Sequence, residues 1–88
     1  MQFMLQFSIP IDKRDVAQER FQATGAVPPD GVNMLGRWHC SGERRGYMLV
    51  ETDDLTLITK FMREWSDVLE FQMAPVITDQ QLAQVMAS

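Results

Sequence analysis

The sequence predicts an α+β domain in which two helices cover one face of a four-stranded antiparallel sheet. Segments with apolar residues at every second position alternate with segments whose apolar residues recur every three or four positions. The first spacing is typical of strands and the second of helices. Between the two expected helices, residues 32–51 consist of two apolar-rich runs on either side of a polar tip that contains glycine. This is the pattern of a β-hairpin. At 88 residues, we expect one domain over 1–88.

Residues 2–9 form the first expected strand, and Pro10 ends it. One face is strongly apolar, and the opposite face is mixed rather than fully polar. The apolar face carries Phe3, Leu5, Phe7 and Ile9, and the mixed face carries Met4, Gln6 and Ser8.

The first helix is expected to run from an N-cap at Asp12 to about Thr24, with Gly25 as a left-handed C-terminal cap. Ile11 and Val16 have the spacing of a hydrophobic staple. The expected buried side consists of Val16, Ala17, Phe21 and Thr24. The expected solvated side consists of Lys13, Arg14, Glu19 and Arg20.

The hairpin is expected to pair residues 32–40 with residues 46–52 after a turn over 28–31. Its register stays open, because a slip of one residue exchanges the faces of Trp38 and His39.

A second helix is expected to start at the cap Asp53. Its buried stripe consists of Leu55, Ile58, Phe61 or Met62, and Trp65. Residues 68–77 form the last strand, and Pro75 predicts that this strand lies at an edge. Thr78 and Gln81 resemble a capping box for a short C-terminal helix.

The resulting order βαββαβ is the ferredoxin-like plan. Right-handed crossovers place both helices on one face of the sheet. The core is then expected from Phe3, Leu5, Phe7, Met48, Val50, Leu69, Phe71 and the two helical stripes. The other face would expose Met4, Tyr47 and Leu49, so we expect a twofold homodimer with sheet facing sheet. A fully solvated face is the alternative.

Four runs, LGRWH, GYMLVETDD, EWSDVLEF and APVI, resemble a small bacterial family of unassigned function in the dimeric α+β barrel superfamily of ferredoxin-like proteins. The resemblance extends from the first strand to Ile77. It implies the fold and the homodimer. That superfamily includes cofactor-free monooxygenases, isomerases and proteins without known activity, so the resemblance does not supply a reaction.

Composition excludes several classes of function. Eight Lys and Arg against twelve Asp and Glu give a net charge of −4, which argues against nucleic-acid and anionic-membrane partners. The single cysteine, Cys40, predicts a reduced, cytoplasmic protein. The apolar N-terminus lacks the basic region of a signal peptide. No ligand spacing predicts a metal, and no motif predicts a cofactor.

The candidate site lies on the hairpin. His39 is the candidate general base, and Glu51 the carboxylate that orients it. Arg37 would bind a polar ligand group, and Trp38 and Tyr47 would form apolar walls. The alternative for His39 is a purely structural role. The alternative for Glu51 is a sheet carboxylate whose charge is paired with that of Arg37. Cys40 and His39 are neighbours on a strand and point to opposite faces, which argues against a nucleophile pair.

Two functions follow. The first is the binding or transformation of a small apolar or aromatic molecule in a pocket near 32–51. The second is a non-catalytic homodimeric interaction or regulatory module, in which the open sheet face serves assembly alone.

Overall fold

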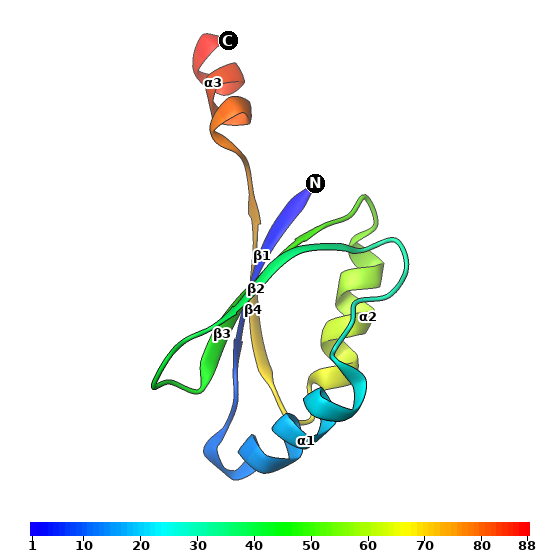
Figure 1. Cartoon of the computed structure of the whole chain (residues 1–88). Coiled ribbons are helices and arrows are strands. Elements are labelled where there is room, and N and C mark those ends of the chain that lie inside the picture. The colour runs from blue at the N-terminus through cyan, green and yellow to red at the C-terminus, as the bar shows by residue number, and fades with distance from the viewer.

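A computed structural model describes residues 1–88 and has the predicted ferredoxin-like α+β fold (Figure 1). The strands are β1 (Gln2–Ser8), β2 (Asn33–His39), β3 (Arg45–Glu51) and β4 (Glu70–Val76). The helices are η1 (Ile11–Lys13), α1 (Arg14–Thr24), α2 (Leu55–Trp65) and α3 (Asp79–Ala87). The strands form one antiparallel sheet in the order β2-β3-β1-β4. β4 therefore lies at an edge, as Pro75 predicts.

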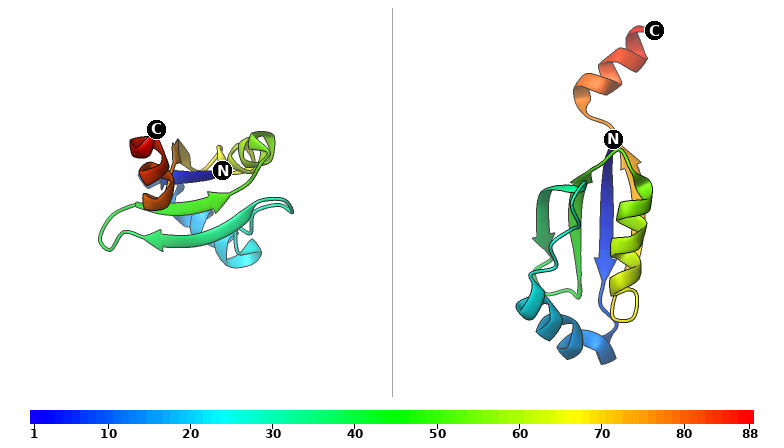
Figure 2. Two further views of the ribbon diagram at one scale, coloured as in Figure 1. Left: turned by 90° about the horizontal axis from the view of Figure 1, so that it is seen from above. Right: turned by 90° about the vertical axis from the view of Figure 1, so that its right-hand side faces the viewer.

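Both α1 and α2 lie on one side of the sheet, here called the helical face, and the other side is the open face (Figures 1 and 2). Burial alternates along β1, with its odd-numbered residues buried under the helices. Leu5, Val50 and Ile58 are the largest fully buried side chains. Burying a side chain of this size stabilises a fold by about 1.5–3 kcal/mol. The core, as expected, lies between the sheet and α2.

The core differs from the expected set at several positions. Of the expected helical stripes, Val16, Thr24 and Leu55 are exposed, and Val68 joins the core unexpectedly. The buried members of the core are Phe3, Leu5, Ala17, Met48, Val50, Ile58, Phe61, Trp65 and Val68. Leu69 and Phe71 are only half-buried. They lie next to the pocket described below, which leaves part of each side chain without a neighbour.

The first helix begins differently from the expectation. One turn of 3-10 helix, η1, precedes α1, and no side-chain cap forms at Asp12. Ile11 and Val16 are 70% and 50% exposed, so the expected staple is wrong. Ala17 is the only buried residue of α1, since the helix meets the core through this small side chain. Gly25 has φ 73° and forms the predicted left-handed cap.

The N-cap of α2 is Asp54 rather than Asp53. Asp54 has extended backbone angles, and its Oδ1 accepts a hydrogen bond of 3.0 Å from the amide of Thr56. Thr52 Oγ1 accepts from the amide of Asp54 and donates to the carbonyl of Gly31. These bonds hold the entry to α2 one residue later than the sequence suggests.

The C-terminal helix α3 projects away from the body (Figure 1). Thr78 and Gln81 form the predicted capping box. No residue of α3 is buried, and its apolar side chains Leu82, Val85 and Met86 are exposed. Among all helices of the chain, none has the length and apolar character needed to cross a bilayer.

Candidate functional site

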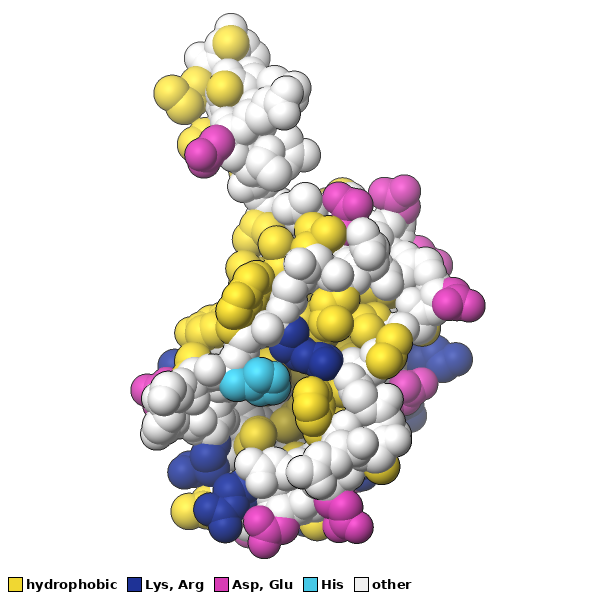
Figure 3. All heavy atoms as spheres, in the orientation of Figure 1, with side chains coloured by type: hydrophobic (Ala, Val, Ile, Leu, Met, Phe, Trp, Pro, Cys, Tyr) yellow, Lys and Arg dark blue, Asp and Glu magenta, His cyan; other side chains and the backbone are white.

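A pocket of about 440 Å³ lies between α1 and the helical face of the sheet. In Figure 3, the histidine (cyan) and a basic side chain (dark blue) border a hollow with a hydrophobic floor. Ten of its fourteen lining residues are hydrophobic. The lining consists of Phe7, Ile9, Ala17, Gln18, Phe21, Gln22, Ala26, Arg37, His39, Met48, Phe61, Trp65, Leu69 and Phe71.

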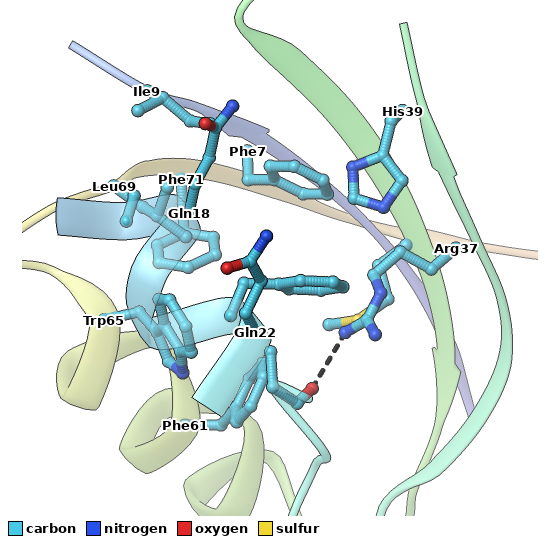
Figure 4. A pocket seen from close by; sticks show the side chains of 14 residues that line it. Phe7, Ile9, Gln18, Gln22, Arg37, His39, Phe61, Trp65, Leu69 and Phe71 are labelled. Carbon is cyan, nitrogen blue, oxygen red and sulfur yellow. Dashed lines mark hydrogen bonds between the residues drawn. The ribbon is translucent and has the colours of Figure 1, made fainter. Parts of the chain in front are cut away.

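The inner side of α1 explains why this space is unfilled. Ala17 and Phe21 are four residues apart and both line the pocket. Gln18 and Gln22 of the same helix also line it and are exposed (Figure 4). A methyl group at Ala17 cannot reach far across the gap. The core on this side is therefore less complete than beneath α2, where Ile58, Phe61 and Trp65 are buried.

The strand register brings two of the predicted site residues into the pocket. Arg37 lies opposite Met48, and His39 lies opposite Gly46, so both point to the helical face. Gly46 has no side chain, and an added Cβ there would overlap the ring of Phe7. The glycine thus gives Phe7 room to lie beside His39.

Aromatic edges surround the imidazole of His39. Its ring centroid is 5.7 Å from that of Phe7 and 5.7 Å from that of Phe21, both in edge-to-face geometry. His39 itself is exposed at the mouth, where Figure 4 shows it next to Arg37. Its two ring nitrogens supply one donor and one acceptor when the ring is neutral.

Arg37 is tied to the end of α1. Its guanidinium donates hydrogen bonds of 2.8 Å to the carbonyl of Ala26 and 3.0 Å to the carbonyl of Gly25. It also lies over the ring of Phe21, with 4.8 Å between Cζ and the ring centroid. Burial lowers the pKa of Arg37 below its usual value. The ion pairs of the chain are made by other groups, so Arg37 has no carboxylate partner.

Arg20, unlike Arg37, has a carboxylate partner. Its assignment to the solvated side is wrong. It forms a two-pronged ion pair with Asp67, with nitrogen-to-oxygen distances of 2.9 and 2.7 Å. Its guanidinium also lies 5.3 Å from the ring centroid of Trp65. The pair joins α1 to the turn after α2.

The remaining predicted site residues lie elsewhere. Trp38 and Tyr47 are opposite each other on the open face, and Trp38 is 56% exposed. Neither lines the pocket, because successive residues of a strand point to opposite faces. Glu51 pairs with Asn33 and Gln2 at the distant end of the hairpin and accepts a hydrogen bond of 3.4 Å from Gln2. Its expected proximity to Arg37 or His39 is not found.

Cys40 is half-buried and free, with its amide bonded to the carbonyl of Arg45 at 2.9 Å. It does not line the pocket. The chain has no group of three or more His, Cys, Asp and Glu side chains that could hold a metal ion.

The sequence interpretation missed several lining residues. Gln18 and Gln22 were not singled out, Phe21 was assigned to the core, and Trp65 was considered for a pocket wall but assigned first to the core. Trp65 is buried and still contributes to the pocket wall. One available signal was the scarcity of large apolar residues on the first helix, where only Val16 and Phe21 occur between 14 and 24. A helix with so little apolar surface cannot fill the space against a sheet.

With this geometry in hand, comparison with protein families gives one match over residues 1–88, to the domain of unknown function DUF3303. The chain belongs to the DUF3303 family. A search of curated proteins found no match to this DUF3303 chain.

Solved structures with the same fold include a candidate antibiotic biosynthesis monooxygenase from Nitrosomonas europaea. It has a TM-score of 0.52 and 8% identity, over 89% of the DUF3303 chain and 100% of the other. An uncharacterised NIPSNAP domain protein from Burkholderia xenovorans has a TM-score of 0.50 and 11% identity, over 90% and 97% of the two chains. At such identities the likeness concerns the fold alone, and it supports the ferredoxin-like α+β fold of this DUF3303 chain.

Proposed function

We propose that this protein binds a small apolar or aromatic molecule in the pocket between α1 and the sheet. The observation that carries the proposal is a cavity of about 440 Å³ with ten hydrophobic residues among its fourteen lining residues. Small-molecule sites have this size and this mixture of apolar walls with few polar groups. Arg37 and His39 are the polar groups that would orient the ligand.

His39 is also the candidate proton acceptor if the ligand is transformed. It is exposed at the mouth, and the rings of Phe7 and Phe21 restrict the orientation of its imidazole. A positioned imidazole is the side chain most often used as a general acid or base. Glu51, Trp38 and Tyr47 have no part in this proposal, because they lie on the open face.

The two tryptophans provide a direct test. Trp65 lines the pocket, whereas Trp38 lies on the open face, so Trp38→Phe leaves one fluorescent reporter at the site. We expect naphthalene and alkyl compounds to change the fluorescence of Trp65 saturably and to raise Tm. Gln22→Phe should weaken both responses by filling the mouth. Ala23→Phe, on an exposed neighbour that does not line the pocket, should not.

The proposal fails if no compound of either type produces a saturable response. It also fails if Ala23→Phe and Gln22→Phe weaken binding equally, because the effect would then come from α1 as a whole.

The biological unit in this proposal is a homodimer. The helices leave one face of the sheet uncovered, and Met4, Tyr47 and Leu49 lie half-exposed on that face beside Trp38. A contiguous apolar face of this kind is favourable to cover with a second copy. Twofold pairing is the commonest symmetry for such contacts. Light scattering across a concentration series would test it.

A non-catalytic homodimeric interaction or regulatory module is the second candidate. The exposed apolar residues of α3 and of the open face favour it, because both are available to other chains. Dimerisation without any ligand response at Trp65 would support this function over the first. The cytoplasmic location expected from the single Cys40 stays a prediction.

A further inference from the structure

We infer that the ligand of this pocket is an anion, namely an apolar or aromatic monocarboxylate whose carboxylate is bound by Arg37 at the mouth. This inference rests on the proposed function and specifies its ligand class. It draws on the charge of the pocket, on the bonding of Arg37 and on the polar groups around it.

The charge of the pocket is opposite to the charge of the chain. Twelve Asp and Glu give the protein a net charge of −4. None of the twelve lines the pocket, whose only charged lining side chain is Arg37. His39 is the other lining residue that can carry positive charge. Such a site in an apolar wall attracts an anion and repels a cation.

Arg37 is held in place and lacks a counterion. Its bonds to the carbonyls of Gly25 and Ala26 use two of the five N–H donors of a guanidinium. Carbonyl oxygens carry only partial negative charge, so they leave most of the positive charge of Arg37 uncompensated. Arg20, by contrast, has its charge compensated by Asp67. A ligand carboxylate would give Arg37 the partner that Arg20 already has.

Further polar groups at the mouth are free to bind the same carboxylate. The side chains of His39, Gln18 and Gln22 make no hydrogen bond within the chain. Arg37 and His39 are two residues apart on one face of β2, which places their Cα atoms about 7 Å apart. Figure 4 shows both side chains on the same side of the pocket, facing the glutamines of α1.

One charge fits this site better than two. The neighbouring end of α1 is its C-terminus, where Gly25 caps the helix, and this end carries partial negative charge. A doubly charged phosphate would meet that repulsion with a single arginine to offset it. A monocarboxylate needs one guanidinium, and its apolar remainder fills the hydrophobic floor.

The test compares three probes of similar shape, namely naphthoate, naphthamide and naphthylmethylammonium, in the Trp38→Phe protein. We expect naphthoate to bind about tenfold or more tightly than naphthamide, which is the effect of a charge-assisted hydrogen bond. The ammonium probe should bind most weakly. Arg37→Gln should abolish the preference for naphthoate, and Arg37→Lys should retain part of it.

Arg44→Gln is the matched control. Arg44 also donates to a backbone carbonyl, that of Ile9 at 3.0 Å, but it does not line this pocket. The substitution Arg44→Gln removes the same charge from the chain as Arg37→Gln and should leave the preference for naphthoate over naphthamide unchanged. The comparison of probes in the protein with Arg37 intact does not depend on the folding of any Arg37 variant.

The outcomes separate this inference from the proposed function. Equal binding of naphthoate and naphthamide, reported by Trp65, overturns the anion inference and leaves the pocket as a neutral apolar site. An equal loss of preference in Arg44→Gln and Arg37→Gln also overturns it, since the effect would then be one of net charge. The absence of binding by every probe overturns the proposed function and this inference with it.

Discussion

The imidazole of His39 meets the phenyl ring of Phe21 edge to face, with 5.7 Å between ring centroids, and this contact joins β2 to α1 across the mouth of the pocket. The same phenyl ring lies under the guanidinium of Arg37. One side chain of a weakly packed helix therefore supports both polar residues of the site. This arrangement leads to the first prediction.

Phe21→Ala should lower the free energy of unfolding by about 2 kcal/mol, less than the loss at a fully buried phenylalanine, because Phe21 is half-buried. The loss comes from the contacts of the ring with His39 and Arg37 as well as from burial. Val16→Ala on the same helix is the control and should cost under about 0.5 kcal/mol, because Val16 is 50% exposed. Urea denaturation measures both. Equal costs would show that Phe21 does not anchor α1.

Gly46→Ala should destabilise the fold by about 1–3 kcal/mol, because the added methyl group overlaps the ring of Phe7 and comes within 2.5 Å of the carbonyl oxygen of Trp38. Gly36→Ala also meets a neighbour, but that neighbour is the exposed ring of Trp38, which can move away. Its cost should be smaller. Thermal denaturation of the two variants compares them, and a larger loss for Gly36→Ala would contradict the described packing around β3.

The pair of Arg20 and Asp67 should make stability depend on acid pH. The hydrogen bonds from Arg20 hold the pKa of Asp67 below its ordinary value of 3.8. The folded protein thus binds this proton less readily than the unfolded chain, so the stabilisation is present above that value and is lost as the pH falls through the folded pKa. Asp67→Asn should lower Tm at neutral pH, and its difference from the parent should shrink towards about pH 2.

Asp30→Asn is the control for this pH series, since Asp30 is exposed and makes no ion pair. It should follow the parent protein at every pH. A difference between Asp67→Asn and the parent that does not change with pH would contradict the link to the Asp67 carboxyl.

Leu49→Lys should prevent formation of the proposed homodimer. Leu49 lies on the open face opposite Met4, and a twofold contact would bring two copies of the new charge close together in an apolar interface. We expect a monomeric mass by light scattering at concentrations where the parent protein is dimeric. Thr59→Lys, at an exposed position of α2, introduces the same charge outside the open face and should leave the mass unchanged.

Much of the fold could be predicted from local patterns. The alternation in β1 identified its buried face, and the three- and four-residue steps identified Ile58, Phe61 and Trp65. Pro75 placed β4 at an edge, because proline has no amide to donate. These features depend on residues near one another in the chain, where side-chain direction follows from the periods of strand and helix.

The candidate site was predicted only in part, because its residues come from separate elements. Arg37 and His39 were selected for their chemistry, but Trp38, Tyr47 and Glu51 were placed with them before the hairpin register was known. The register puts those three on the open face. The partners of Arg37 are backbone carbonyls, which carry no sequence signal, so the pairing of Arg37 with Gly25 and Ala26 was not visible either.

The sequence by itself determined which segments become strands and helices and which of their faces are apolar, since these properties are local. Only the tertiary structure decided that His39 rather than Trp38 faces the helices and that an unfilled space remains beside Ala17. The physical reason is that pairing register and helix-to-sheet distance result from packing among all elements together.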